Sequence, residues 1–369
     1  MKSLFLKTFP PPTFLSRPAV GLDISDRSIK FVELTNKGGN CILKRYGELD
    51  IPAGVIDQGS IQKVDELVKI LSDWRTKFSP EIKETIVSLP EEVAYVVRLS
   101  LPKVPDHQLR QTIELQLDQY VPLSLDNMVF DFEKINIKHK PGLEVIDILV
   151  TVFPLDESRK YFEVLSSAGF TPLVFEIEPQ ALARIAMADR SVDTIMIVEI
   201  GRSRTGIEIV SNGVMVLTST ILNIGGDSMT ASIKKNLNID SDEAENLKIT
   251  HGLLRSKSNL EIFNSLLPIT SSLKDELNKV ILFWKKKESE NGYYNSPVNR
   301  VVLCGGQSSL PGLVEYLSGQ LKLPVEILNP WQHKCFDYKK DLPQMSYKES
   351  LRYATAISLA LRGVYNIKS

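Results

Sequence analysis

The sequence carries the same hairpin pattern twice, about half a chain apart. The first copy, residues 20–34, places Asp23 near the end of a strand, just before a turn and a returning strand. The second copy, residues 194–210, places Glu199 at the same point. Two copies of one supersecondary unit in one chain indicate a duplicated scaffold. We therefore expect a two-lobed α/β protein in which each lobe opens with an acidic hairpin.

The composition agrees with such a protein and excludes some partners. The chain has 369 residues, 43% hydrophobic content and a net charge of −1. This length predicts two or three domains. A net charge near zero provides no field that attracts nucleic acid, so we expect no nucleic-acid partner. No run of about 18 apolar residues is present, so no membrane span is expected.

Residues 1–18 precede the first hairpin and include three consecutive prolines. They lack the uninterrupted apolar segment and the cleavage site of a signal peptide. We expect a flexible or loosely docked tail. A weak membrane or partner contact through Phe5, Leu6 and Phe14 is the alternative.

The cysteines and histidines do not form a site pattern. Cys41, Cys304 and Cys335 are far apart and have no CxxC spacing, and the four histidines are equally scattered. Buried or incidental thiols in a reducing cytoplasm are therefore favoured over a disulfide or a zinc site.

Hydrophobic spacing predicts the remaining elements. The expected helices span 61–77, 109–120, 156–168, 178–190, 227–237, 241–249, 259–286, 311–320 and 346–362. The expected strands span 41–49, 85–89, 93–99, 129–137, 145–153, 173–175, 214–220, 300–303 and 325–328. The stretch 91–170 forms a compact block that we interpret as an insertion into the first lobe.

The acidic hairpins are the first candidate site. A tight turn after a strand directs several backbone N–H groups into one concavity, which suits phosphate oxygens. Asp23 and Glu199 could hold Mg²⁺ through water, and Lys30 could contact a phosphate. One such turn alone would be an ordinary surface turn, but a matching pair is a stronger indication.

Two glycine pairs and one charged pair complete the candidate site. Gly225-Gly226-Asp227 precedes a helix, where the backbone N-terminus favours anions, although Asp227 could simply cap the helix. Gly305-Gly306 links a strand to a helix and could lie against a base or a phosphate. Glu245 and Lys248 share a helix face, as an ion pair or as contacts to ribose and adenine.

The order of these motifs resembles that of the actin-like ATPase superfamily. Within it, the chain resembles the PilM family of type IV pilus assembly proteins, relatives of the cell-division protein FtsA. The segments that carry the resemblance are GLDISDRSIKFVEL, EPQALAR, GGDSMTASI, AENLK and CGGQSSLPGL, and they cover roughly residues 19–365. Their joint order is specific, whereas no single segment is.

The resemblance implies an actin-like fold around a nucleotide cleft. Subdomain 1A would hold 19–90 and 171–192, and an inserted subdomain 1C would hold 91–170. Subdomain 2A would hold 193–227 and 296–369, and subdomain 2B would hold 228–295.

The resemblance also implies a set of ligand-binding residues for ATP or ADP with Mg²⁺. Glu178 would lie near the attacking water as the catalytic candidate, and Asp23 and Glu199 would hold the metal through water. The implied nucleotide-binding residues are Asp23, Ser25, Lys30, Glu199, Gly201, Ser203, Arg204, Thr205, Gly225, Gly226, Asp227, Glu245, Lys248, Gly305, Gly306 and Gln307.

The chain departs from the family pattern in its phosphate turns. Ser25 and Ser203 replace glycines, Glu199 replaces an aspartate, and Arg204 replaces a threonine. Serine restricts the backbone, and Arg204 could fill or contact the space of a γ-phosphate. We therefore expect nucleotide binding, as a structural ligand or a slow switch, with at most slow hydrolysis.

The implied function is that of a cytoplasmic ATP-binding scaffold in type IV pilus assembly. It would bind the N-terminal cytoplasmic segment of a PilN-like inner-membrane protein in a groove between 1A and 1C. It would thus be peripheral to the inner membrane through this partner, and self-association is possible. The alternatives are an FtsA-like membrane-associated filament protein, an actin-fold small-molecule kinase and a secretion-system relative such as GspL.

Overall fold

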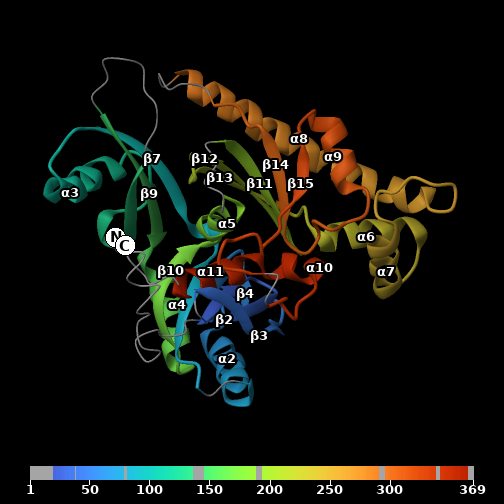
Figure 1. Cartoon of the computed structure of the whole chain (residues 1–369), viewed down its shortest axis with the longest axis horizontal. Helices are drawn as coiled ribbons and strands as arrows, with labels where there is room; N and C mark the ends of the chain where they lie inside the picture. The colour runs from blue at the N-terminus through green and yellow to red at the C-terminus, as the bar shows by residue number, and fades with distance from the viewer. Residues whose placement is uncertain are drawn as a thin grey trace.

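The computed structural model describes residues 20–37, 39–78, 81–135, 145–187, 193–290, 296–337 and 341–364. The predicted tail, 1–18, lies outside these ranges. Figure 1 shows two α/β bodies, each built on a twisted sheet, and a smaller sheet beside the first of them. We call the two bodies the first and the second lobe.

The first lobe is built on a five-stranded sheet of order β10-β6-β1-β2-β3. These strands are β1 (Val20–Ile24), β2 (Ser28–Lys37), β3 (Asn40–Asp50), β6 (Glu84–Leu89) and β10 (Thr171–Ile177). β1, β2 and β3 form an antiparallel meander, while β6 and β10 continue the sheet in parallel to β1. The short strands β4 (Ile56–Asp57) and β5 (Ser60–Ile61) form a separate hairpin.

The second lobe is built on a five-stranded sheet of order β13-β12-β11-β14-β15. These strands are β11 (Thr194–Ile200), β12 (Arg204–Ser211), β13 (Val214–Leu222), β14 (Arg300–Cys304) and β15 (Val325–Ile327). The lobe repeats the first sheet, with an antiparallel meander at one side and two strands added in parallel at the other.

The two hairpins agree residue by residue. Asp23 pairs with Lys30 across β1 and β2, and Glu199 pairs with Gly206 across β11 and β12. Both turns are closed by one backbone hydrogen bond, from Ser25 to Ser28 in the first and from Gly201 to Arg204 in the second. The predicted duplication and its alignment are therefore confirmed at the level of strand register.

A three-stranded antiparallel sheet of order β7-β9-β8 lies beside the first lobe. Its strands are β7 (Tyr95–Pro102), β8 (Met128–Ile135) and β9 (Val145–Pro154). One face packs on α3 (Asp106–Leu117) around a separate apolar cluster that includes Leu109, Ile113 and Val150. β9 also contributes Leu149 and Phe153 to the main core, so the sheet packs on the first lobe through its opposite face.

The other helices cover and connect the sheets. They are α2 (Val64–Phe78), α4 (Leu155–Ser167), α5 (Glu178–Ala186), α6 (Gly226–Leu237), α7 (Ser241–His251), α8 (Leu260–Glu290), α9 (Leu313–Leu321), α10 (Tyr347–Ser350) and α11 (Ala354–Val364). Short 3₁₀ turns are η2 (Glu91–Val93), η3 (Leu125–Asn127) and η4 (Leu351–Tyr353). The helix expected at 346–362 is therefore divided, since η4 separates α10 from α11.

The C-terminal helix α11 belongs with the first lobe. It packs on β1, β2, β6 and α5, and its residues from Ala354 to Leu361 are buried. The contact is close at Gly21, where a Cβ atom would lie 2.1 Å from the carbonyl oxygen of Ala356. The expected division assigned this helix to subdomain 2A, but its packing partners lie in the first sheet. The other expected boundaries of subdomains 1A, 1C, 2A and 2B stay predictions.

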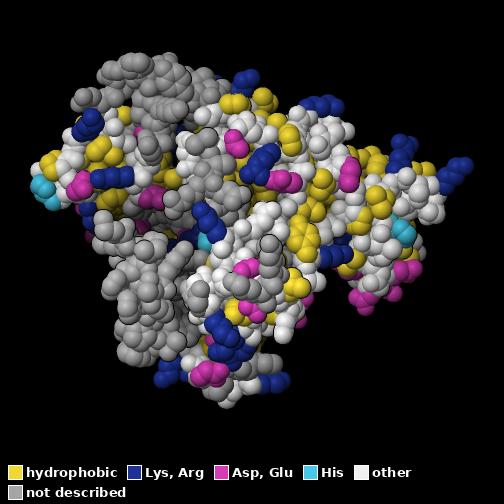
Figure 2. Space-filling model, in the orientation of Figure 1, with side chains coloured by type: hydrophobic (Ala, Val, Ile, Leu, Met, Phe, Trp, Pro, Cys, Tyr) yellow, Lys and Arg dark blue, Asp and Glu magenta, His cyan; other side chains and the backbone are white. Residues whose placement is uncertain are grey.

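The helices of the described ranges do not combine the length and the hydropathy that a bilayer crossing requires. Figure 2 shows basic and acidic side chains interspersed over one face of the molecule rather than segregated by sign. This mixture agrees with the net charge of −1.

Candidate functional site

A large cleft between the lobes collects most of the predicted site residues. Its volume is about 1040 Å³, and the walls come from both hairpins, from α6 and α7, and from the loop after β14. The predicted residues that line it are Asp23, Ser25, Lys30, Glu178, Glu199, Gly201, Ser203, Arg204, Gly226, Asp227, Glu245, Lys248, Gly305, Gly306 and Gln307. Segments that are far apart in the sequence thus converge on one site.

Thr205 and Gly225 do not line the cleft. Thr205 is buried, and its hydroxyl group donates a hydrogen bond of 2.7 Å to the carbonyl oxygen of Ile224. Gly225 lies so close to the second turn that a Cβ atom would be 2.7 Å from the carbonyl oxygen of Arg202. Both residues therefore support the cleft wall from behind.

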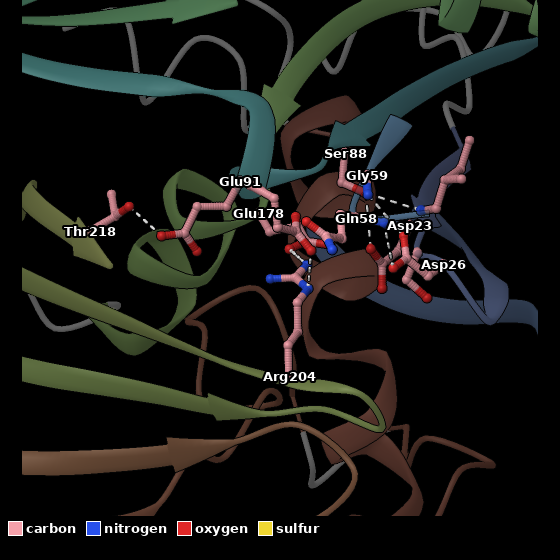
Figure 3. A network of polar contacts seen from close by, with 12 residues as sticks. Asp23, Asp26, Gln58, Gly59, Ser88, Glu91, Glu178, Arg204 and Thr218 are labelled. Atoms are coloured by element: carbon pink, nitrogen blue, oxygen red, sulfur yellow. Dashed lines mark hydrogen bonds and ion pairs between the residues drawn. The ribbon is translucent and has the colours of Figure 1, made fainter. Parts of the chain in front are cut away.

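The first turn is held in place by its own side chains. Ser25 Oγ donates to the carbonyl oxygen of Ser28 at 2.9 Å, so the serine that departs from the expected glycine helps to close the turn. Asp26 accepts hydrogen bonds from the backbone N–H groups of Gln58 and Gly59 at 3.0 and 2.9 Å (Figure 3). The turn is thereby fixed to the β4–β5 hairpin before any ligand binds.

Asp23 is compensated by its neighbours. Ser88 Oγ on β6 donates to Asp23 Oδ1 at 2.9 Å and accepts the backbone N–H of Ile24 at 3.1 Å. Lys30 Nζ lies 4.0 Å from Asp23 Oδ2 and 3.9 Å from Glu48 Oε1. Lys30 thus joins two carboxylates at the cleft wall, where an anion could compete for it.

Glu199 has a different environment from Asp23. The residue opposite it is Gly206, which offers no countercharge. Burial, opposed by Arg204 and reinforced by Asp23, raises the pKa of Glu199 to about 7. Glu199 therefore changes its charge in the neutral range, at the wall of the cleft.

Arg204 leaves the second turn and reaches the first lobe. Its Nε lies 2.5 Å from Glu92 Oε1, and its Nη2 donates to Glu178 Oε2 (Figure 3). Burial disfavours the charge of Arg204, but Glu178, Glu92 and Glu199 more than compensate and raise its pKa. Burial also raises the pKa of Glu178 despite the contact with Arg204. The side chain predicted near a γ-phosphate is thus an ionic link between the lobes.

The glycine motif after β13 forms the start of α6. Helix α6 begins at Gly226 with Gly225 as its N-cap, so Asp227 lies in the first turn and the alternative that it caps the helix is wrong. The N–H groups of Gly226 and Asp227 donate to the carbonyl oxygens of Gly201 and Arg202 at 3.0 and 2.8 Å. The helix terminus is therefore bonded to the second turn, and only part of it remains available for an anion.

The loop after β14 completes the floor of the cleft. Gly305 has a φ of +83°, and a Cβ atom there would lie 2.6 Å from the carbonyl oxygen of Ile200. The Gln307 side chain packs on Gly226, and the backbone N–H of Gln307 donates to the carbonyl oxygen of Ile200 at 3.1 Å. Gly306 faces the flexible side chain of Arg352. The backbone conformation and the contact with Ile200 thus require glycine at 305, whereas at 306 the absence of a side chain leaves room for Arg352.

Glu245 and Lys248 form a bonded group with α6. Lys248 Nζ lies 2.7 Å from Glu245 Oε2, and it donates to Thr230 Oγ1 at 2.9 Å and to the carbonyl oxygen of Gly226 at 3.1 Å. Burial lowers the pKa of Lys248 in spite of the Glu245 contact. The Lys248 side chain is 1% exposed. Besides lining the cleft, it therefore acts as a tie between the two helices, because its hydrogen bonds join α7 to α6.

Several further cleft residues were not among the predicted site residues. They are Asp26, Arg27, Ser28, Glu48, Gly206, Arg202, Thr230, Ala231, Lys234, Ser241, Asp242, Ile249, Ser309, Leu310, Pro311, Ser346, Lys348, Glu349 and Arg352. Asp26 and Thr230 lie within the segments GLDISDRSIKFVEL and GGDSMTASI, and their place in these motifs could have identified them. Glu48, Lys348 and Arg352 reach the cleft only through tertiary packing.

The carboxylates of the cleft do not form a ready-made metal cage. Among the described residues, no three or more His, Cys, Asp or Glu side chains are grouped so that they could hold a metal ion. Asp23 and Glu199 both line the cleft, which is compatible with contact to a metal through water.

Comparison with known proteins agrees with this geometry. A family model described as Type IV pilus assembly protein PilM matches residues 21–364. The solved PilM-PilN type IV pilus biogenesis complex contains a chain that is 22% identical with a TM-score of 0.77, and the match covers 95% of this chain and 99% of that chain.

Two further solved structures are similar at lower identity. The ethanolamine utilization protein EutJ from Carboxydothermus hydrogenoformans is 18% identical with a TM-score of 0.55, and the match covers 96% of this chain and 90% of that chain. MreB5 of Spiroplasma citri bound to ADP is 13% identical with a TM-score of 0.54, over 92% and 95% of the two chains. Likeness at this level of identity shows the fold, which is the actin-like ATPase fold, as the motif order predicts.

Proposed function

Because this chain belongs to the PilM family of type IV pilus assembly proteins, we propose that it is a cytoplasmic ATP-binding scaffold of type IV pilus assembly. Its partner would be the N-terminal cytoplasmic segment of a PilN-like inner-membrane protein, which would hold it at that membrane. The observation that carries the proposal is the match with the PilM-PilN complex over 95% of this chain. The family match does not favour an FtsA-like filament protein or a small-molecule kinase.

The proposed groove lies between β8 and the first lobe. β8 is an edge strand, and its residues Val129, Asp131 and Glu133 share one exposed face. Although the Glu133 residue is exposed, partial desolvation of its carboxyl group at this junction, together with Glu176 and Asp131, raises the pKa of Glu133, while Arg362 opposes this effect. Glu133 is therefore in electrostatic contact with Glu176 on β10 and Arg362 on α11, across the junction of the two sheets.

The charges of this groove indicate what it would bind. Arg362 and Arg184 are committed to Glu176, with Arg362 Nη1 3.2 Å from Glu176 Oε2. Asp131 and Glu133 remain on the open face of β8 beside Val129, which is 39% exposed. An extended peptide with basic and apolar side chains fits such an edge, by the strand-addition mode of peptide recognition.

A binding measurement with designed variants tests the partner. A synthetic peptide of the PilN-like N-terminal tail from the same genome should bind the full chain in calorimetry. Glu133→Lys should weaken binding by about tenfold or more, because a central interface residue is reversed in charge. Leu282→Ser is the matched surface control, since Leu282 is 65% exposed on α8 of the second lobe. Lack of binding by the unmodified chain would refute the proposed partner.

The cleft would hold ATP or ADP, with Mg²⁺ bound mainly by the phosphates and water. The residues fit such a ligand: Lys30 offers a cation between two carboxylates, and Gly306 leaves room for a flat ring beside Arg352. Bound Mg²⁺ would supply charge neutralisation of the phosphates. Nucleotide released from the purified protein by denaturation and separated by chromatography tests this part of the proposal.

We expect hydrolysis to be slow because Glu178 is engaged. Its carboxylate is buried and accepts a hydrogen bond from Arg204, so it is not free to orient or deprotonate a water molecule. Glu178→Gln should therefore leave the already low rate of phosphate release nearly unchanged. A large loss of turnover in this variant would instead identify Glu178 as a catalytic residue.

A further inference from the structure

The connection between the first lobe and the three-stranded sheet is a short 3₁₀ turn. β6 ends at Leu89, η2 spans Glu91–Val93, and β7 starts at Tyr95. The turn therefore sets the direction in which β7 leaves the first lobe. Of its two acidic residues, Glu91 is buried, and the side chain of Glu92 is only 7% exposed.

The partners of these two acids come from the second lobe. Thr218 Oγ1 on β13 donates to Glu91 Oε1, and Arg204 Nε on β12 lies 2.5 Å from Glu92 Oε1. Figure 3 shows the Glu91 side chain pointing toward Thr218, while Arg204 reaches up from its own strand toward Glu178. Adjacent residues of η2 are thus held by adjacent strands of the other lobe.

The second lobe leaves space for the Glu91 side chain of this turn. The absence of a side chain at Gly206 leaves space for Glu91, since a Cβ atom there would lie 3.3 Å from Glu91 Oε2. β13 also contacts β7 directly. The side chains of Arg204 and Glu92 are 14% and 7% exposed, so water screens their attraction only weakly.

We infer that Arg204 and Thr218 are positioning residues that fix the three-stranded sheet on the first lobe, and with it the peptide groove along β8. The inference concerning the groove rests on the proposed function. The physical reason is that η2 is the covalent lead into β7, and β7 and β8 both pair with β9. A change of direction at η2 therefore moves β8 relative to β10 and α11.

The test uses two single substitutions in the full chain. Arg204→Met keeps most of the side-chain volume and removes the charge, and Thr218→Val keeps the shape and removes the hydroxyl group. Arg300→Met is the control for the first substitution. Arg300 also forms an ion pair within the second lobe, with Glu326, but this pair lies on β14 and β15, away from η2. Ser219→Ala is the control for the second, on the neighbouring residue of β13.

The first measurement is amide hydrogen exchange, which needs no partner. Both variants should speed exchange in η2 and in β7, β8 and β9 by about 3- to 30-fold while α6, α7 and α8 keep the exchange of the unmodified chain. The controls should change neither region. Unchanged exchange in β7 to β9, or an equal increase throughout the chain, would overturn the inference.

The second measurement is affinity for the tail peptide. Both variants should weaken binding by about 3- to 30-fold, because the groove is displaced although its own residues are intact. Unchanged affinity together with faster exchange in the sheet would overturn the link to the groove. If the unmodified chain binds no peptide, the proposed function fails, and the exchange measurement alone decides the role of Arg204 and Thr218. Arg204→Lys should recover part of both effects, since it restores the charge without the second hydrogen bond.

Discussion

Glu199 lies opposite Gly206 in the second hairpin, whereas the equivalent Asp23 lies opposite Lys30 in the first. The same backbone register therefore presents a compensated carboxylate on one side of the cleft and a poorly compensated one on the other. Burial raises the pKa of Glu199 to about 7 as a result.

This asymmetry predicts a pH-dependent contribution to stability. In the unfolded chain Glu199 loses its proton near its ordinary pKa of 4.5, but in the folded chain it keeps the proton up to about pH 7. The folded state thus binds more protons in this window, and stability falls as the pH rises through it. Glu199→Gln should remove at most about 3 kcal/mol of this loss, measured by urea unfolding at pH 5 and pH 8.

A second substitution separates the contribution of Glu199 to the pH dependence of stability from that of other buried carboxyl groups. Burial also raises the pKa of Glu178 and Glu208, so the unmodified chain has a larger total slope of the same sign. Glu315→Gln, on an exposed position of α9, should leave that slope as it is. Equal slopes in the unmodified and Glu199→Gln chains would show that Glu199 is ionised throughout.

Neighbouring glycines in the loop after β14 should respond differently to alanine. Gly305→Ala should destabilise the protein by about 1–3 kcal/mol, because its φ of +83° is strained for alanine and the Cβ atom meets the Ile200 carbonyl. Gly306→Ala should cost less than about 1 kcal/mol, because the nearest atom belongs to the flexible Arg352 side chain. Gly306→Ala should nevertheless weaken ATP binding, measured by calorimetry. Unaltered ATP affinity in that variant would argue against a base beside Gly306.

Lys248 should contribute to both stability and ligand binding. Lys248→Met removes the donor for Glu245, Thr230 and Gly226, and we expect a loss of about 1–3 kcal/mol with reduced nucleotide affinity. Lys234 also lines the cleft but is exposed, so Lys234→Met is the control for stability. Thermal unfolding with and without ATP distinguishes the two effects. A variant as stable as the control would contradict the role of Lys248 as a tie between α6 and α7.

The close contact between β1 and α11 should not tolerate a side chain. Gly21→Ala places a Cβ atom 2.1 Å from the Ala356 carbonyl oxygen, and this backbone cannot move without displacing the helix. We expect a loss of more than about 3 kcal/mol, or failure to fold. Gly319→Ala, with open space around its Cβ position, is the control in soluble expression and urea unfolding. A Gly21→Ala protein of normal stability would contradict this packing.

The sequence predicts the strands and hairpins well because their signals are local. The alternation in the hairpins and the glycine turns fixes the register, and the duplication places Glu199 on Asp23. The cleft could be anticipated because strand ends and glycine loops of an α/β sheet gather at one edge. The position of α11 could not, since its apolar face is compatible with either sheet and only Gly21 marks the choice.

The direction of the Arg204 side chain is a second feature that could not be predicted from the sequence. Arg204 adjoins a phosphate turn in the sequence. This position is consistent with a side chain that contacts a γ-phosphate and equally with one that fills the space of that phosphate. Its actual partners, Glu92 and Glu178, lie more than twenty residues away in the chain and belong to the other lobe. A long-range ion pair of this kind leaves no periodic or spacing signal.

The packing of α11 on β1 also has a consequence for synthesis. β1 leaves the ribosome among the first described residues, and the helix that covers it is the last. At about 5–20 residues per second, roughly 15 to 70 s separate the two. During this interval the face of the first sheet that carries Gly21 and Ile86 lacks the helix that covers it, so the first lobe must wait for the second before its core can close. We expect the nascent chain to depend on chaperones for that period, although its N-terminal half contains nearly a complete sheet.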